Sequence, residues 1–248
     1  MNSTSRTVVP LHNDFFNDGH WYVLSSSSLG GGGLGIPEFS EKLQSEDVSV
    51  INELLRKGIC LPLYFGCDCA LDNAIFVVGD LNEREEAEWI GRIRLNLEVP
   101  CGELMLMGGG LEEDFETALP NFEPPDPHFR FFQKLKLEPG SYLVEVYAFL
   151  GSYPVNEEWE ELENENEMDE WWEASRPGEA KPEWISFFND DEYVDSEEFE
   201  FIEHIIRVVP SSGEVPLPGL DEETKWVGEF EMRRPELCPK GLKREDVL

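Results

Sequence analysis

Apolar and polar side chains alternate along several stretches of the chain, and this alternation predicts β-strands. Residues 92–99 are the clearest case, because every second side chain is apolar and the others are Arg, Asn or Glu. Residues 129–137 repeat the pattern. Residues 142–149 follow them after the turn sequence Glu-Pro-Gly-Ser, in which Pro presets one backbone angle and Gly accepts a positive φ. We therefore expect 129–137 and 142–149 to pair as a hairpin.

Helical periodicity is confined to short stretches. Four apolar residues between positions 48 and 55 recur at helical spacing behind an acidic entrance, and Gly58 follows as an end signal, which predicts a helix at about 46–57. Residues 83–90 predict a short helical turn. Residues 25–35 (SSSSLGGGGLG) are rich in Ser and Gly and predict a flexible surface loop. They do not form a phosphate-binding loop, because no Gly-Lys-Ser/Thr follows them.

Together these patterns predict a mainly β fold. Further strands are expected at 7–24 (two strands around a turn at Asn17-Asp18-Gly19), 59–65, 74–81, 103–107, 199–209 and 226–232. We expect an antiparallel β-sandwich with one or two short helices. It would form a single domain over 1–248, with a Ser/Gly loop at 25–35 and an acidic, Trp-containing insertion at 156–198.

The chain is strongly acidic, with 53 Asp and Glu against 19 Lys and Arg and a formal net charge of −34. Such a charge repels nucleic-acid phosphates and anionic lipid heads, so we expect no direct nucleic-acid binding and no membrane binding. No apolar run approaches the ~18–20 residues that span a bilayer, and the opening MNSTSRTVVPLHND has no apolar core of a secretory signal. The charge favours a basic protein partner, metal cations or simply solubility, and of these we expect a basic protein partner; the oligomeric state stays open.

Half of the net charge lies in one segment. Residues 156–200 hold 19 acids and two bases, a net charge of −17 in 45 residues, together with four of the seven tryptophans. Solvating acidic tails are usually poor in aromatics, so two interpretations stay open. Either the tryptophans pack back on the sheet, or they serve as binding anchors within a negative field. Under the second interpretation the partner-binding residues are Glu157, Glu158, Trp159, Glu160, Glu161, Trp171 and Trp172.

A search for catalytic and metal-binding patterns finds none in the sequence. The four histidines form no metalloprotease motif, and there is no Gly-x-Ser-x-Gly elbow. His204 lies within an apolar run, where we expect a hydrogen-bonded histidine of the sheet, and the acids at 190–195 lack the spacing of an EF-hand. Five irregularly spaced cysteines favour reduced thiols in the cytoplasm. We therefore expect no catalytic residues, no metal site and no cofactor.

The order of several segments resembles the ComJ-like β-sandwich proteins, a family named for the bacterial competence protein J. The resemblance rests on Leu11–Phe15, the apolar strand Ile75–Val78, the alternating strand 92–99, the turn Leu137–Tyr142 (LEPGSY) and the late strand 199–209. It implies a compact β-sandwich and a small protein that binds and restrains a DNA-entry nuclease. The length of the chain, the Ser/Gly loop and the acidic insertion depart from the family pattern.

The sequence thus favours an inhibitor or regulator that binds a basic partner. A nuclease or another DNA-binding protein fits, because its groove is lined with Lys and Arg. An alternative is an assembly or structural protein whose sandwich face binds the partner, while the acids only keep it soluble. A third hypothesis is an enzyme with scattered carboxylates, which needs a deep cleft with converging acids and a strongly raised pKa.

Overall fold

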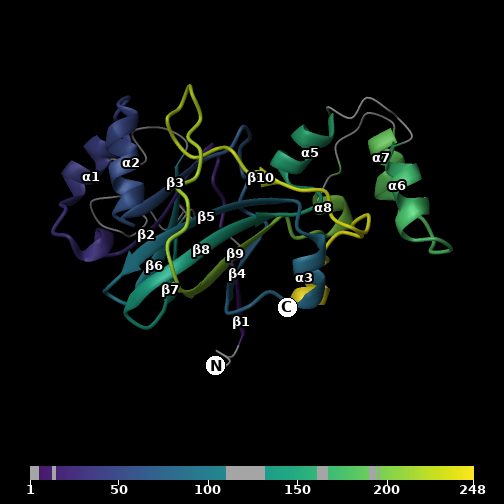
Figure 1. The fold of residues 1–248 in the computed structure, drawn as a ribbon, viewed down its shortest axis with the longest axis horizontal. Helices are drawn as coiled ribbons and strands as arrows, with labels where there is room; N and C mark the ends of the chain where they lie inside the picture. The colour runs from purple at the N-terminus through teal and green to yellow at the C-terminus, as the bar shows by residue number, and fades with distance from the viewer. Residues whose placement is uncertain (1–5, 13–14, 110–131, 161–166, 190–193, 195) are drawn as a thin grey trace.

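Ten β-strands in two sheets form the body of the protein in the computed structural model, which describes residues 6–12, 15–109, 132–160, 167–189, 194 and 196–248. Helices lie at both ends of the sheets (Figure 1). One end carries α1 (Ile36–Leu43) and α2 (Val48–Arg56), and the other carries α5 (Tyr153–Glu160), α6 (Glu167–Ser175) and α7 (Trp184–Asn189). No helix of this described part is long and apolar enough to cross a bilayer.

The larger sheet has six strands in the order β1-β4-β9-β8-β5-β10. Its β4 and β9 run parallel, whereas the other neighbours are antiparallel, so the expected all-antiparallel architecture is wrong at this pair. Parallel strands need a long connection, and much of the chain separates these two. The strands are β1 (Thr7–Pro10), β4 (Ala74–Val78), β9 (His204–Pro210), β8 (Gly140–Ala148), β5 (Gly91–Val99) and β10 (Glu231–Met232).

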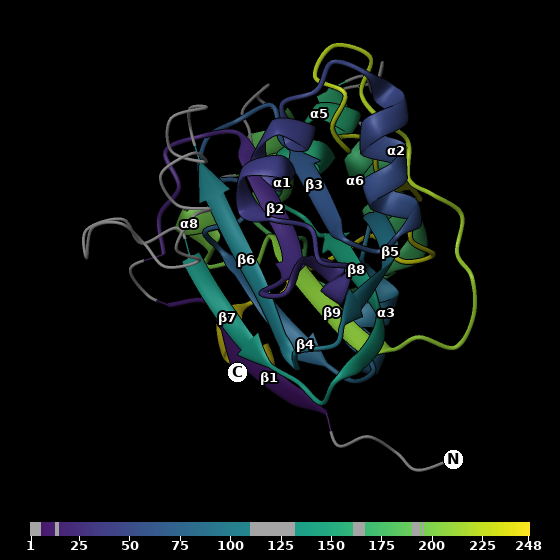
Figure 2. The ribbon, with the colours of Figure 1, turned by 90° about the vertical axis from the view of Figure 1, so that its left-hand side faces the viewer.

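The smaller sheet has four strands in the order β3-β2-β6-β7, all paired antiparallel. They are β3 (Cys60–Tyr64), β2 (Trp21–Ser26), β6 (Glu103–Gly109) and β7 (Phe132–Lys136). Figure 2 shows this sheet nearer the viewer than β4, β8 and β9 of the larger one. The remaining helices are η1 (Leu29–Gly31), α3 (Glu83–Glu88), α8 (Ser196–Phe199) and α9 (Arg244–Val247), so the described helices outnumber the one or two that we expected.

The hairpin expected between 129–137 and 142–149 is wrong. Strand β7 pairs with β6 in the smaller sheet, while β8 pairs with β5 and β9 in the larger one. The turn between them passes from one sheet to the other, and the Tyr142 hydroxyl fixes it by donating to the Glu138 carbonyl at 2.6 Å. Alternation reports that a strand has one buried face, but it does not identify the strand's partner.

Two local predictions are confirmed. Along β5 the residues alternate strictly between buried and half-buried, as the pattern of 92–99 indicates. Helix α2 begins where Asp47 accepts a hydrogen bond from the Ser49 backbone, which satisfies one free amide of the first turn. It ends before Gly58, whose φ is +61° and whose Cβ, if it had one, would lie 2.8 Å from the Asn96 carbonyl oxygen. Only glycine is accommodated there without strain.

The Ser/Gly segment 25–35 is more firmly packed than the flexible loop we expected. Ser25 and Ser26 are buried residues of β2, and the Ser25 hydroxyl donates to the Ile59 carbonyl at 2.6 Å. The Ser26 hydroxyl accepts from the Gly30 amide at 2.9 Å, and Leu29 is buried. Helix α1 begins directly after this segment, and the spacing of apolar residues in the sequence did not predict it.

Three clusters of buried hydrophobic residues fill the described interior, and two of them pack against the helices at the ends of the sheets. The larger cluster takes side chains from both sheets and from the inner faces of α1 and α2. The second cluster lies under the acidic insertion, whose described part contains α6, α7 and the end of α5, and it includes Trp159, Trp171, Trp172 and Trp184. The first of the two open interpretations therefore describes these tryptophans: they pack inward, against one another and against the end of the larger sheet.

Candidate functional site

The seven residues predicted to bind a partner separate into two groups. Glu157 and Glu158 are exposed on α5, whereas Trp159, Trp171 and Trp172 are buried. Trp159 stacks on Trp184 at 6.0 Å between ring centroids and meets Trp171 edge-on at 6.1 Å. A partner cannot contact these rings without unpacking them. The Glu160 side chain and Glu161 lie outside the described residues.

Helix α5 owes its orientation to its own sequence. Pro154 occupies the first turn, where a missing amide costs nothing, and the Ser152 carbonyl accepts from the amides of Val155 and Asn156 at 3.0 Å. Val155 and Trp159, four residues apart, share the buried face. Glu157 and Glu158 therefore point away from the core.

A cavity of about 560 Å³ opens beside these two carboxylates. Its wall also includes Asp221 and Glu229, which come from the chain that follows β9, so four carboxylates surround one space. None of its lining residues is Lys, Arg or His. We call this cavity the acidic pocket. Its size falls in the range of about 300–1,000 Å³ that small-molecule sites occupy.

Aromatic rings supply the rest of the wall. Tyr64 stands at the end of β3, Tyr153 begins α5, and Phe230 precedes β10. Phe65 is buried at the base, with its ring centroid 6.0 Å from that of Phe230. Aromatic faces attract cations, and nearby carboxylates strengthen that attraction. The wall thus combines the two surfaces that a Lys or Arg side chain prefers.

The segment 221–232 reaches the pocket by adding to the edge of β3. The Tyr64 amide donates to the Val227 carbonyl at 2.9 Å, and the Val227 amide donates to the Pro62 carbonyl at 3.0 Å. The buried Trp226 anchors the segment, since its indole nitrogen donates to the Leu43 carbonyl at 2.9 Å. Of the strand predicted at 226–232, Val227 makes one isolated bridge to Leu63 of β3, and only Glu231 and Met232 form a strand, β10.

The Asp221 carboxylate is held in its charged form. It accepts hydrogen bonds from the amides of Glu223 and Thr224 at 2.9 and 2.6 Å, and these bonds, that to the Thr224 backbone first, lower its pKa. Hydrogen bonds to a carboxylate favour ionisation. This wall of the pocket therefore keeps a full negative charge throughout the neutral range.

Two groups beside the pocket, Tyr153 and Cys67, have raised pKa values to which nearby carboxylates contribute. Burial first, and then the charge of Glu157, raise the pKa of Tyr153 to about 12. Burial raises the pKa of the nearby Cys67 thiol to about 12, with further contributions from Glu203, Asp68 and Glu157. Both groups are discouraged from ionising, so neither a tyrosinate nor a thiolate nucleophile is favoured here.

His204 lies beneath the floor of the pocket. It is fully buried at the start of β9, with ring centroids 5.5 Å from Phe65 and 6.3 Å from Phe230. His204 is the buried histidine of the sheet that we expected, but within the described part of the chain neither ring nitrogen makes a hydrogen bond of normal length and angle, and the Ala70 backbone comes near enough only to act on the pKa. Burial lowers its pKa to about 3, and the Ala70 backbone offsets only part of that shift. The ring is neutral near pH 7.

One carboxyl outside the pocket has a raised pKa. Burial raises the pKa of Asp72 to about 6, although it accepts hydrogen bonds from the Asn17 amide at 3.1 Å and the Tyr22 hydroxyl at 3.5 Å. Asp72 is not among the residues that line the acidic pocket. Among the described residues, no group of three or more His, Cys, Asp and Glu side chains is placed to hold a metal ion. The acids at 190–193 and 195 lie outside the described residues.

Comparisons with known proteins give little to add to this geometry. No family model matches the chain, and no curated protein matches it. A solved structure titled "Crocagin biosynthetic gene J" is 13% identical and covers 83% of this chain and 96% of its own, with a TM-score of 0.38. A likeness at that TM-score carries no argument about fold or function. The resemblance to the ComJ-like family stays a prediction.

Proposed function

We propose that the protein is a binding module that inhibits or regulates a basic protein partner, and that the acidic pocket receives a Lys or Arg side chain of that partner. The two sheets act as a β-sandwich scaffold, and α5 with the segment 221–232 presents the pocket. A partner that binds nucleic acid fits this chemistry, because such proteins expose clustered Lys and Arg. The carboxylates of the acidic pocket bind the partner's Lys and Arg side chains in place of the nucleic-acid phosphates that those side chains otherwise contact.

The observation that carries the proposal is the composition of one wall. Glu157, Glu158, Asp221 and Glu229 share a cavity with four aromatic residues and with no basic residue in its lining. Like charges brought together repel one another, so this arrangement gains most when a cation enters.

The test measures binding of a fluorescently labelled Arg-rich peptide by anisotropy. At a salt concentration of about 0.05 M we expect saturable binding that weakens strongly at about 0.5 M, because the charges are partly exposed and salt screens them. The double variant Glu157→Gln/Glu158→Gln should weaken binding about tenfold at low salt, as two close charge contacts are lost.

The matched control is Glu173→Gln/Glu183→Gln, which removes the same charge from exposed positions that do not line the pocket. We expect it to change the peptide affinity less than about twofold, since neither carboxylate lines the pocket and salt screens exposed charges. Equal losses in the two double variants would show that only the total charge matters. Deletion of 156–198 is unsuitable, because it would remove the tryptophans of the second cluster.

A further inference from the structure

A second cavity has the opposite character. It measures about 520 Å³ and is lined by Arg84, Ala87, Glu88, Arg176, Arg233, Glu236, Leu237 and Lys240. Four of the 19 basic residues of a chain with net charge −34 thus surround one space. Two carboxylates, Glu88 and Glu236, also line it, and two more pair with its cations from outside the lining: Asp246 with Arg84 at 2.6 Å and Glu179 with Lys240 at 2.5 Å. We call this cavity the basic pocket.

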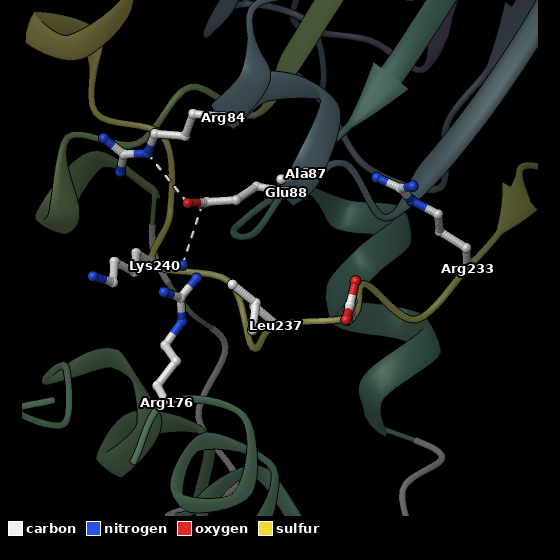
Figure 3. Close-up of a pocket in the computed structure, with 8 residues that line it drawn as sticks. Arg84, Ala87, Glu88, Arg176, Arg233, Leu237 and Lys240 are labelled. Carbon is white, nitrogen blue, oxygen red and sulfur yellow. Dashed lines mark hydrogen bonds and ion pairs between the residues drawn. The ribbon is translucent and has the colours of Figure 1, made fainter. Parts of the chain in front are cut away.

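Three elements distant in sequence bring these cations together. Arg84 comes from α3, Arg176 follows α6, and Arg233 and Lys240 belong to the chain after β10. Figure 3 shows Arg84, Glu88, Arg176 and Lys240 gathered on one side of the pocket, with Arg233 across from them and Leu237 between. The space between the charged groups is lined by Leu237, and the carboxylate of Glu236 also belongs to the lining.

Backbone carbonyls and aromatic rings fix two of the guanidinium groups. The Arg176 Nε donates to the Cys238 carbonyl at 2.6 Å, and its guanidinium lies 5.4 Å from the Trp172 ring centroid. The Arg233 Nε donates to the Trp89 carbonyl at 2.9 Å, and its guanidinium lies 3.5 Å above the Trp89 ring. These partners orient the side chains without supplying a full negative charge.

The remaining charges of the pocket are mutually engaged. Glu88 is buried and accepts hydrogen bonds from the Arg84 Nε and the Lys240 backbone amide, both at 3.2 Å. The Lys240 ammonium pairs with the exposed Glu179 at 2.5 Å, and Glu179 lies 3.7 Å from Arg176. Exposed pairs of this kind contribute little stability, so a stronger anion can replace Glu179. Burial lowers the pKa of Arg233, and the charge of Glu86 offsets only part of that shift.

We propose that the basic pocket binds the phosphate group of a small organic phosphate. A phosphate monoester carries a charge of about −1.5 to −2 at pH 7, more than the single charge of the Glu179 carboxylate that it would displace, and its oxygens suit guanidinium donors. Arg176 and Lys240 hold the phosphate, with Arg233 available to a second anionic group. Ala87 and Leu237 face the organic part of the ligand, and Glu88 fixes Arg84 and the Lys240 backbone.

The experiment is isothermal titration of the full chain with inorganic phosphate and with pyrophosphate, at an ionic strength held at about 0.15 M with chloride. We expect saturable binding at one site, with pyrophosphate tighter than phosphate because it also reaches Arg233. Lys240→Gln should weaken pyrophosphate binding about tenfold, and Arg233→Gln should do so more for pyrophosphate than for phosphate. The control is Lys136→Gln, an exposed residue of β7 outside the pocket, which should leave binding unchanged.

Three results would overturn the proposal: no saturable heat with either probe, equal losses in Lys240→Gln and Lys136→Gln, or tighter binding of succinate than of phosphate. Arg233 also supports the fold through its bond to Trp89, so Arg233→Gln is interpreted only if its far-ultraviolet circular dichroism equals that of the wild type. Lys240 has an exposed side chain, and its variant alone decides the outcome if Arg233→Gln fails to fold. The proposed partner-binding function does not depend on these results.

Discussion

The acidic pocket and the basic pocket are neighbours along one segment of chain and opposite in charge. The first pocket is lined by Gly228, Glu229, Phe230 and Met232, and the second by Arg233, Glu236, Leu237 and Lys240, so the chain passes from one pocket to the other between Met232 and Arg233. The acidic pocket places four carboxylates together without a basic residue in its lining, whereas the basic pocket mixes four cations with two carboxylates. The net charge of the whole chain therefore does not predict the charge of either pocket.

The difference between the pockets lies in how each charge is held. In the basic pocket, carbonyl oxygens and tryptophan rings orient Arg176 and Arg233, and a buried carboxylate links the remaining members. In the acidic pocket, Glu157 and Glu158 stand on the outer face of a helix whose inner face is packed. A rigid framework suits a small ligand, while exposed carboxylates suit a large partner that approaches from solvent.

The largest expected effect comes from the packing beneath the acidic pocket. Trp159→Ala should lower the free energy of unfolding by about 3–5 kcal/mol, because it empties the space between Trp171 and Trp184. Urea denaturation followed by circular dichroism measures this loss. Trp159→Phe keeps an aromatic ring in place and should cost about a third as much.

The same variant separates the two pockets. At a temperature where Trp159→Ala remains folded, its affinity for the Arg-rich peptide should fall by a larger factor than its affinity for pyrophosphate, since α5 carries two acidic-pocket carboxylates and no residue of the basic pocket. A loss of stability below about 1 kcal/mol would mean that the ring is dispensable to the core, and it would restore Trp159 as a candidate for partner contact.

A smaller effect concerns the neutral histidine below the acidic pocket. The folded pKa of His204 is about 3, below the ordinary value of about 6.5. Between these values the unfolded chain binds a proton that the folded chain does not, so stability falls as the pH drops from about 6.5 toward 3. The slope reaches about 1.4 kcal/mol per pH unit. Over the interval from pH 6 to 4.5 the His204 contribution falls by about 2 kcal/mol.

His204→Leu removes this contribution and also removes two unpartnered ring nitrogens. We expect its free energy of unfolding to be equal to or above that of the wild type at pH 7, and to exceed it further at pH 4.5. Asp72 acts in the opposite direction, because its folded pKa of about 6 lies above its unfolded value and protonation stabilises the fold as the pH falls. The difference between variant and wild type isolates His204. Parallel stability curves for the two proteins from pH 7 to 4.5 would contradict this account.

Local elements of the fold were predictable from the sequence, but their partners were not. The alternation of 92–99 and the capped helix after Asp47 rest on neighbouring residues, and both are confirmed. The turn after Leu137 was also recognisable, yet it joins two sheets where we expected one hairpin. Pairing depends on how the whole chain folds, and no local period carries that information.

The candidate site was predictable only in part, for the same reason. The density of acids around 157–158 drew attention to α5, but Asp221 and Glu229 were two carboxylates among 53 and had no distinguishing neighbour. The order of acid and Trp along 156–200 left burial undecided, because a short amphipathic helix and an exposed anchor motif share that composition. No pattern in the sequence predicts that Arg84, Arg176 and Arg233 lie around one cavity, because the three residues are far apart in the chain.

The smallest expected effect sharpens the contrast on the basic side. Glu88→Gln keeps the shape of the side chain but removes the charge that holds Arg84, so it should lower the free energy of unfolding by about 1 kcal/mol. Arg84 is partly exposed, and solvent screening keeps the loss small. The matched variant is Glu236→Gln, an exposed lining residue, which should leave stability within about 0.5 kcal/mol of the wild type.

Both variants raise the local charge of the basic pocket by one, so both should bind pyrophosphate more tightly, by about twofold to fivefold. Neither variant should change the affinity of the acidic pocket for the Arg-rich peptide, because Glu88 and Glu236 line the basic pocket and not the acidic one. Tighter peptide binding or weaker pyrophosphate binding in Glu236→Gln would show that the two pockets do not act as separate electrostatic sites. If Glu88→Gln alone loses pyrophosphate affinity, the carboxylate organises Arg84 and Lys240 more than it competes with the ligand.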